Sequence, residues 1–254
     1  MLKIKTNGTL IAFERRGTGA PMVLLHGYPL DHTIWEPLVP MLEKDFDLIL
    51  PDLRGFGDSQ AMGTNLVMAD YAADVAGLLD QLNIQKAAVA GHSMGGYVAL
   101  AIARAYPSRV LGLGLVSSQV LADTPENKAG RYQQANAIMA NGVKDVAESM
   151  SAKLSNRPDL QAWLKDLILK QSPAGLAGAL RAMAERPDST SLLAGFDYPI
   201  VLVHGLVDAL IPVERARSVK TAVPGAHLTE IPDTGHMAMM EAPQKTADAL
   251  KALL

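Results

Sequence analysis

The chain has 254 residues, of which 49% are hydrophobic and 19% charged, and its formal net charge is −3. This balance predicts a folded domain with its own core and excludes a disordered chain. Because there is no cysteine, disulfides and thiolate metal sites are excluded, and the absence of a basic surplus predicts no nucleic-acid partner. No apolar run is long enough to cross a bilayer, and residues 1–6 lack the apolar core of a signal peptide. We therefore expect a cytoplasmic protein with no membrane partner.

The first half of the chain alternates short apolar runs with helical patterns. A β-hairpin is predicted around Asn7-Gly8, a turn dipeptide between two alternating segments. Further strands are predicted over 21–25, 46–50, 87–90 and 110–116, and helices over 33–42, 68–82 and 97–103. Strands that alternate with helices predict a mainly parallel sheet covered on both faces.

This alternation stops after residue 118 and resumes near residue 191. The segment between shows helical patterns alone, for example over 133–139 and 160–169. Strands are then predicted over 199–204 and 227–231, and helices over 213–223 and 244–254. We expect an α/β core of residues 1–118 and 191–254 with an eight-stranded, mostly parallel sheet. Residues 119–190 are expected to form a helical cap inserted over that sheet.

The pentad Gly91-His92-Ser93-Met94-Gly95 lies between a predicted strand and a predicted helix. Glycines on both sides of the serine suit a tight turn, because side chains there would collide with the neighbouring backbone. The start of the helix also places backbone N–H groups beside any negative charge that develops at the serine. Ser93 is therefore the predicted nucleophile.

A serine hydroxyl is a poor nucleophile at neutral pH, so it needs a base, and the base needs a group that holds its tautomer. His236 is the favoured base, since it follows the last predicted strand and so lies at the same sheet edge as Ser93. The alternatives are His204, which ends a strand, and His227, which begins one at the opposite edge.

Asp208 is the favoured acid, because it follows the strand predicted over 199–204 at that same edge. Asp197 precedes the strand and falls at the opposite edge, and Asp233 is better explained as a turn former. Asp123 is a weaker alternative, since some hydrolases place the acid after the preceding strand.

An oxyanion that forms during acyl transfer needs preorganised hydrogen-bond donors. The backbone N–H of Met94, at the start of the helix, is one predicted donor. The other is the N–H of Tyr28, in the loop after the strand predicted over 21–25, whereas the following Pro29 has no N–H to offer.

Together these motifs resemble those of the α/β-hydrolase superfamily over nearly the whole chain. In order, they are His26-Gly27-Tyr28-Pro29, Asp52-Leu53-Arg54-Gly55-Phe56-Gly57-Asp58-Ser59, Gly91-His92-Ser93-Met94-Gly95-Gly96, Asp208 and Gly235-His236. The resemblance implies a capped serine hydrolase similar to small carboxylesterases, lactonases and the cofactor-free haloperoxidases that act as perhydrolases. In those haloperoxidases a proline often follows the oxyanion-hole residue, as Pro29 does here. Dehalogenases and epoxide hydrolases carry an aspartate where this chain has Ser93, which argues against both.

The expected activity is hydrolysis of a small carboxylic ester through an acyl-enzyme, with Ser93 as nucleophile, His236 as base and Asp208 as the acid that orients the base. Perhydrolysis, lactone opening and carbon–carbon bond cleavage on the same residues are alternatives, as is a ligand receptor built on a hydrolase fold. No cofactor is expected, and the oligomeric state is left open.

Four residues are candidates for substrate contact: Pro29, His92, Trp163 and Met237. His92 either lines the pocket or supports the turn, and Trp163 either faces the pocket or belongs to the core of the cap. Met237 either lines the pocket, where a flexible methionine side chain adapts to substrates of varied shape, or packs under the last helix. His26 is expected to position the oxyanion loop through a hydrogen bond. The six histidines show no ligand spacing, so no metal site is expected.

Overall fold

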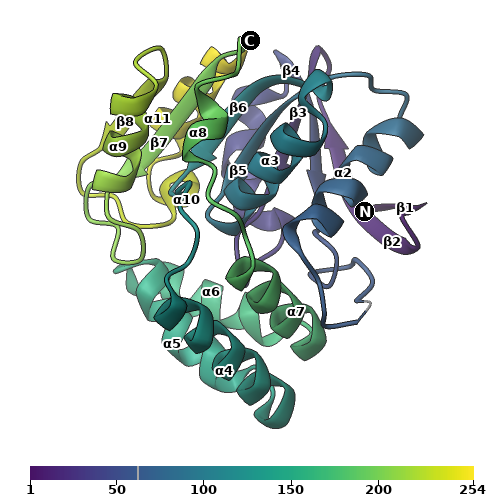
Figure 1. The fold of residues 1–254 in the computed structure, drawn as a ribbon, viewed down its shortest axis with the longest axis vertical. Coiled ribbons are helices and arrows are strands. Elements are labelled where there is room, and N and C mark those ends of the chain that lie inside the picture. Colours follow the sequence, from purple (N-terminus) through teal and green to yellow (C-terminus); the bar gives the residue numbers. More distant parts are fainter. Residues whose placement is uncertain (62) are drawn as a thin grey trace.

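The protein is described by a computed structural model that covers residues 1–61 and 63–254. At its centre is an eight-stranded sheet of order β1-β2-β4-β3-β5-β6-β7-β8 (Figure 1). The strands are β1 (Leu2–Thr6), β2 (Thr9–Arg16), β3 (Ala20–Leu25), β4 (Phe46–Pro51), β5 (Ala87–His92), β6 (Val110–Val116), β7 (Ile200–Gly205) and β8 (His227–Ile231). Within the described residues, β2 pairs antiparallel with β1 and β4, and the other neighbouring strands are parallel. The predicted α/β fold with a mostly parallel eight-stranded sheet is confirmed.

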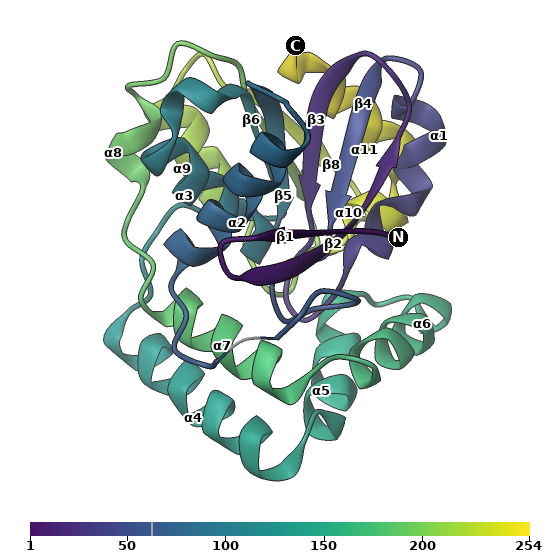
Figure 2. The ribbon, with the colours of Figure 1, turned by 90° about the vertical axis from the view of Figure 1, so that its right-hand side faces the viewer.

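Helices cover both faces of this sheet, as Figure 2 shows. One face carries α2 (Met68–Gln81) and α3 (Met94–Ala105), with α8 (Thr190–Leu193) and α9 (Glu214–Ala222) toward the β8 edge. The other carries α1 (Val39–Leu42), α10 (Ala238–Glu241) and α11 (Pro243–Leu250), with the 3-10 helices η1 (His32–Leu38) and η3 (Lys251–Leu253). A further 3-10 turn, η2 (Pro107–Arg109), leads into β6. Successive strand residues feed opposite layers: Val23 packs in one core and Leu24 in the other.

The helix predicted over 33–42 differs from expectation. It begins as the 3-10 helix η1 and continues as the four-residue α1, so its two parts have different windings. Pro37 lies inside η1 and lacks the N–H that a continuous α-helix needs at that position. Asp31 caps the start, where its carboxylate accepts a hydrogen bond from the backbone N–H of Thr33 at 3.0 Å.

Four helices between β6 and β7 form a separate layer beside the edge of the sheet (Figure 2). They are α4 (Pro125–Asn141), α5 (Lys144–Leu154), α6 (Pro158–Leu169) and α7 (Pro173–Ala184), with α4 packed on α7 and α5 on α6. The structure describes all of residues 119–190 and places no strand among them. The layer approaches the core closely at Gly55 and Gly175, where a Cβ on Gly55 would lie 2.6 Å from the Cα of Gly175.

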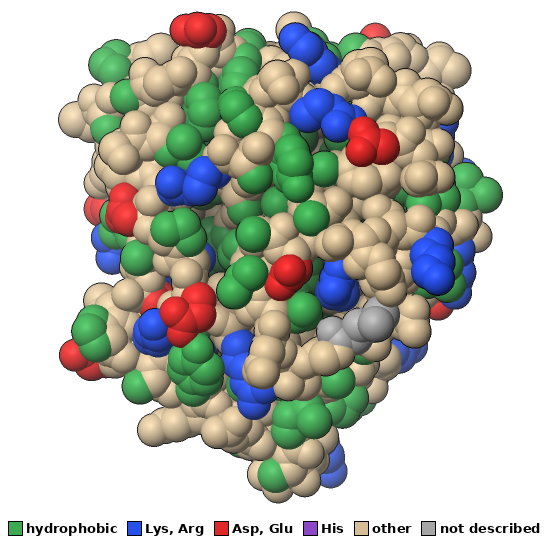
Figure 3. Space-filling view, turned by 45° about the vertical axis from the view of Figure 1, so that its right-hand side comes forward, with side chains coloured by type: hydrophobic (Ala, Val, Ile, Leu, Met, Phe, Trp, Pro, Cys, Tyr) green, Lys and Arg blue, Asp and Glu red, His purple; other side chains and the backbone are tan. Residues whose placement is uncertain are grey.

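The surface carries charges of both signs. On the face shown in Figure 3, the acidic and basic side chains of the described residues are scattered among apolar ones and form no continuous patch of one sign. No helix within the described part of the chain combines the length and apolar character that a membrane span requires.

Asp52 ties the loop after β3 to the loop after β4. One carboxylate oxygen accepts hydrogen bonds from the backbone N–H of His32 at 3.0 Å and from its ring Nδ1 at 2.6 Å. The other accepts the N–H of Asp58 at 2.9 Å. Burial raises the pKa of Asp52, but the hydrogen bonds and charge of His32 outweigh burial and hold that pKa below its ordinary value. For His32, burial lowers the pKa, but Asp52 outweighs it, so the pKa is raised.

Replacing Asp52 by asparagine should therefore destabilise the protein by about 2–4 kcal/mol, because the buried charge that pairs with His32 is lost and one of the two acceptor oxygens becomes an amide nitrogen that cannot accept. Urea unfolding at pH 6 measures the loss. Asp58→Asn, at an exposed position of the same loop, is the matched control and should change stability little. Equal midpoints for wild type and Asp52→Asn would contradict the anchoring role.

The pH dependence of this difference has a defined sign. The contribution of Asp52 is complete above the ordinary carboxyl pKa of 3.8 and is lost as the pH falls through its lowered folded-state pKa. The contribution of His32 is complete below the ordinary imidazole pKa of 6.5 and is lost as the pH rises through its raised folded-state pKa. The free energies of unfolding of wild type and Asp52→Asn should thus differ most between about pH 4 and pH 6.5.

Candidate active site

Ser93 joins β5 to α3 through a backbone conformation that residues other than glycine rarely adopt, with φ at 51°. Left-handed conformations of non-glycine residues cost about 1–3 kcal/mol and persist where the surroundings hold them. Here the Ser93 N–H donates to the Val116 carbonyl at 2.9 Å, and the Ser93 carbonyl accepts the Gly96 N–H at 2.9 Å and the Ser118 hydroxyl at 2.8 Å. The turn is therefore fixed by hydrogen bonds from the next strand and from its own helix.

The two flanking glycines are required by close backbone approaches. A Cβ on Gly91 would overlap the carbonyl group of Gly95, and a Cβ on Gly95 would overlap the carbonyl oxygen of Leu25. This is the collision with neighbouring backbone that the pentad predicts.

The carboxylate of Asp208 and the ring of His236 are hydrogen-bonded, with 2.8 Å between Oδ2 and Nδ1, and their side chains are at most 1% exposed. The other oxygen of Asp208 accepts the backbone N–H groups of Leu210 at 2.9 Å and Ile211 at 3.0 Å. Burial raises the pKa of Asp208, but the charge of His236 and these hydrogen bonds outweigh burial and hold the pKa well below its ordinary value. An ionised Asp208 accepts a hydrogen bond from Nδ1–H of His236, which leaves Nε2 of that ring as the basic nitrogen.

Ser93 and His236 line the same cavity, of about 390 Å³, together with Tyr28. In the part of the chain that the structure describes, the Ser93 hydroxyl and the His236 ring are not hydrogen-bonded to each other. Such bonds are often long in unliganded enzymes and tighten when substrate binds. The wall opposite is formed by residues of α4, α5 and α7.

The two predicted oxyanion donors belong to the residue after the serine and to a residue that lines the same cavity. Met94 is the first residue of α3, so its N–H has no acceptor within the helix. Tyr28 follows β3 on a loop that His26 holds in place. Nε2 of His26 accepts the N–H of Leu53 at 2.9 Å, and its Nδ1 donates to the Gly27 carbonyl at 3.0 Å. Because both ring nitrogens are occupied and burial lowers the pKa of His26, this imidazole is neutral.

The alternative bases lie away from the serine. His204 is buried behind Asp208: its Nε2 donates to the Ile211 carbonyl at 2.7 Å and lies 3.4 Å from Asp208 Oδ2. Sequence analysis missed this neighbour of the acid, although its spacing of four residues from Asp208 was visible. His227 is exposed at the first residue of β8, the end of the strand away from His236.

The alternative acids have other partners or places. Asp197 precedes β7, and Asp233 is exposed in the turn before His236, where its φ is 55°. Asp123 does line the cavity, but its carboxylate binds Arg131 and Arg186 rather than a histidine. Of the described carboxylates, only that of Asp208 is hydrogen-bonded to the His236 ring.

His92 supports the turn of His236 and does not reach the cavity. Its side chain is fully buried, its Nε2 donates to the backbone carbonyl of His236 at 3.1 Å, and the two ring centroids are 4.8 Å apart. Burial and the neighbouring imidazole lower its pKa well below the ordinary value, so His92 is neutral. The two roles predicted from sequence were lining the pocket and supporting the turn at Ser93; the hydrogen bond found here goes instead to the turn of His236.

The other three candidates for substrate contact also lie outside the cavity lining given by the described residues. Pro29 is buried, and Met237 is fully buried in the core layer that also contains Leu250 of α11. Trp163 is 37% exposed and lines a different cavity, between α6 and η1, with Glu36 and Met240 among its neighbours. The structure thus does not bring these residues to Ser93.

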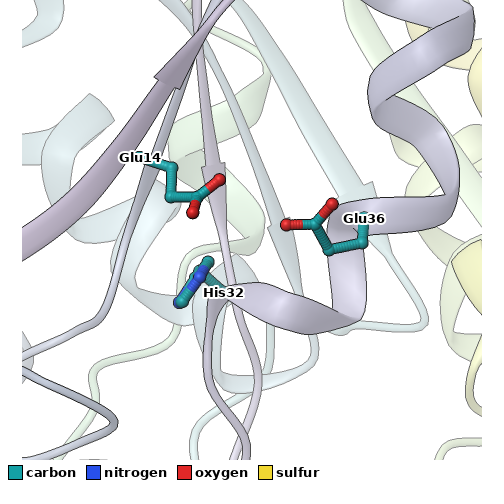
Figure 4. Close-up of side chains that lie close together, drawn as sticks. All are labelled: Glu14, His32 and Glu36. Atoms are coloured by element: carbon teal, nitrogen blue, oxygen red, sulfur yellow. The ribbon is translucent and has the colours of Figure 1, made fainter. Parts of the chain in front are cut away.

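The fold brings together three side chains of the kinds that bind metal ions, although their spacing in the sequence predicts no metal site. Ligand atoms of Glu14, His32 and Glu36 lie within 4.8 Å of one another, and Figure 4 shows the two carboxylates facing each other above the ring. A second group joins His32 to Asp31 and Asp52. Nδ1 of His32 is already bonded to Asp52, and neither group shares a residue with the lining of the Ser93 cavity.

Comparisons with known proteins agree with this geometry. A family model described as the alpha/beta hydrolase fold matches residues 20–243. A pimeloyl-[acyl-carrier protein] methyl ester esterase from Aromatoleum aromaticum is 32% identical over 244 residues, which cover 89% of this chain and 94% of that protein. A 3-oxoadipate enol-lactonase from Acinetobacter baylyi is 29% identical over 221 residues, or 85% of this chain and 81% of that protein. A malate-bound thermophilic esterase from Thermogutta terrifontis superposes with a TM-score of 0.94 at 38% identity, covering 98% and 96% of the two chains.

Proposed function

The chain belongs to the α/β-hydrolase family, and from this premise we propose that it is a serine hydrolase that cleaves carboxylic esters through an acyl-enzyme. Similar proteins are named esterases and an enol-lactonase, so the chain is a hydrolase that acts on esters. The observation that carries the finer proposal is the hydrogen bond of 2.8 Å between Asp208 and His236, beside the cavity that His236 shares with Ser93.

In the acylation step, the Ser93 oxygen attacks the ester carbonyl carbon while Nε2 of His236 takes the hydroxyl proton. Asp208 holds the opposite nitrogen and stabilises the imidazolium that forms. The carbonyl oxygen becomes an oxyanion and accepts hydrogen bonds from the N–H groups of Tyr28 and Met94. When the tetrahedral intermediate collapses, the alcohol leaves with the proton from His236.

Deacylation repeats these roles with water. His236 takes a proton from a water molecule, the resulting hydroxide attacks the acyl carbon, and Ser93 departs with the proton returned by His236. The products are a carboxylic acid and the regenerated serine. A lactone would pass through the same steps with its alcohol still tethered to the acyl group, and the similarity to an enol-lactonase favours lactones as a second substrate class.

Covalent labelling tests the proposed nucleophile. A p-nitrophenyl phosphonate ester should react once per chain, because the activated serine oxygen displaces p-nitrophenolate and leaves a stable phosphonyl ester. Mass spectrometry of peptides should place the adduct on Ser93, and His236→Ala should slow labelling strongly. An adduct on another residue, or unchanged labelling in His236→Ala, would overturn the assignment.

A further inference from the structure

The cavity beside Ser93 has a charged wall that comes from the segment between β6 and β7. Asp123, Arg131 and Lys153 contribute to this wall. The carboxyl of Asp123 is only 3% exposed and binds two guanidinium groups, those of Arg131 and Arg186. Arg186 is itself buried, and its guanidinium lies 4.3 Å above the ring of Tyr97. These contacts form a fixed charged cluster rather than a solvated surface.

This cluster carries an excess of positive charge. Two guanidinium groups share the single carboxylate of Asp123, which leaves a net charge of one. Glu126 also lines the cavity, but it is exposed, and its pKa is lowered by its own backbone N–H and by Thr124 rather than by an arginine. Lys153 has no ion-pair partner among the residues that the structure describes, and its charge offsets that of Glu126, so the wall keeps a net positive charge of one.

Arg131 has N–H donors that form no hydrogen bond within the cluster. Its Nε donates to Asp123 and its Nη1 contacts the sulfur of Met183 at 3.6 Å, while Nη2 makes no hydrogen bond to the described residues. The side chain is 24% exposed and lies on the cavity. Tyr28 of the predicted oxyanion loop lines the same cavity as Arg131. The unused donors therefore belong to a side chain that lines the Ser93 cavity.

We propose that Arg131 binds a carboxylate carried by the substrate, so that the preferred substrates are monoesters or lactones of dicarboxylic acids. A planar guanidinium with free N–H groups matches a carboxylate, and Asp123 and Arg186 hold it in a fixed orientation. Lys153 attracts the same anionic group toward the cavity. This inference rests on the proposed ester hydrolysis at Ser93.

The test compares two esters of equal length, monomethyl adipate and methyl hexanoate, which differ by a carboxylate in place of a methyl group. Acid release at constant pH 7.5 gives kcat/KM for each. We expect wild type to favour monomethyl adipate by about 10-fold or more, because a charge-assisted hydrogen bond is gained. Arg131→Gln should bring the ratio close to one, chiefly by raising KM for monomethyl adipate. Arg131→Lys, which keeps the charge beside Asp123, should retain part of the preference.

Lys128→Gln is the matched control, since Lys128 lies on the same helix but pairs with Glu185 outside the cavity lining. Its ratio should equal that of wild type. If wild type hydrolyses neither ester nor p-nitrophenyl acetate, the proposed function fails. If it hydrolyses both methyl esters without preference, or if Arg131→Gln keeps the wild-type ratio, only the role of Arg131 is overturned. The wild-type comparison stands even if Arg131→Gln does not fold.

Discussion

Replacing Ser93 by alanine should lower kcat for p-nitrophenyl acetate by at least about 10⁴-fold, because the oxygen that forms the acyl-enzyme is removed. KM should change little, since the cavity wall and the predicted oxyanion donors are retained. Alanine at this position keeps the left-handed backbone strain that serine already has, so unfolding should also change little. Initial rates at saturating ester, followed by p-nitrophenolate absorbance, measure the effect.

Ser117→Ala is the matched control for this loss. Ser117 follows β6 at the same sheet edge, has a similar φ of 47° and is buried, but it is not among the residues that line the Ser93 cavity. Its replacement should leave kcat within a few-fold of wild type. Turnover by Ser93→Ala at the wild-type rate would show that another group performs the chemistry.

Asp208→Asn should lower kcat by about 10⁴-fold with little change in KM. The amide of asparagine can accept a hydrogen bond from Nδ1–H of His236 only through its single oxygen. If its nitrogen faces the ring instead, that nitrogen donates a hydrogen bond, and Nδ1 must then be unprotonated. Nε2 of His236 then carries the proton and cannot act as the base. The backbone N–H groups of Leu210 and Ile211, which fix the carboxylate, favour an oxygen on their side and so direct the amide nitrogen toward His236.

Asp233→Asn provides the comparison for Asp208→Asn. This aspartate lies three residues before His236 in an exposed turn with φ at 55°, a conformation that asparagine also accepts. We expect its kcat to match wild type. Equal losses in the two variants would assign the effect to the turn rather than to the hydrogen bond with the imidazole.

The order of strands and helices was predictable, because most of the parallel strands are short apolar runs; β8, His-Leu-Thr-Glu-Ile, is the exception. Helix ends were less predictable. Gly95 and Gly96 do not favour a helix by propensity and the helical pattern was predicted over 97–103, yet α3 includes both glycines and begins at Met94. The nearby strand forces that start, since the Ser93 N–H is bonded to Val116 on β6. Tertiary contacts of this kind override local preference.

The predicted catalytic residues could be chosen because chain order and sheet edge constrain them, whereas the cavity wall could not. Every residue of β5 is buried, so its burial pattern does not reveal whether His92 faces the cavity or the turn of His236. Arg131 resembles a solvated residue of a polar helix in sequence. In the structure it pairs with Asp123, eight residues earlier. Asp123 also pairs with Arg186, which follows the last of the inserted helices in the chain.

The close approach of Gly55 and Gly175 limits how this enzyme can be re-engineered. Helices α4 to α7 are encoded by one uninterrupted stretch, so a chimera could exchange them for those of another hydrolase and leave residues 93, 208 and 236 on the original scaffold. A donor stretch would need a glycine where α7 meets residue 55, because any larger residue there would push the transplanted helices off the core. Donor sequences can be screened for that single requirement before any chimera is made.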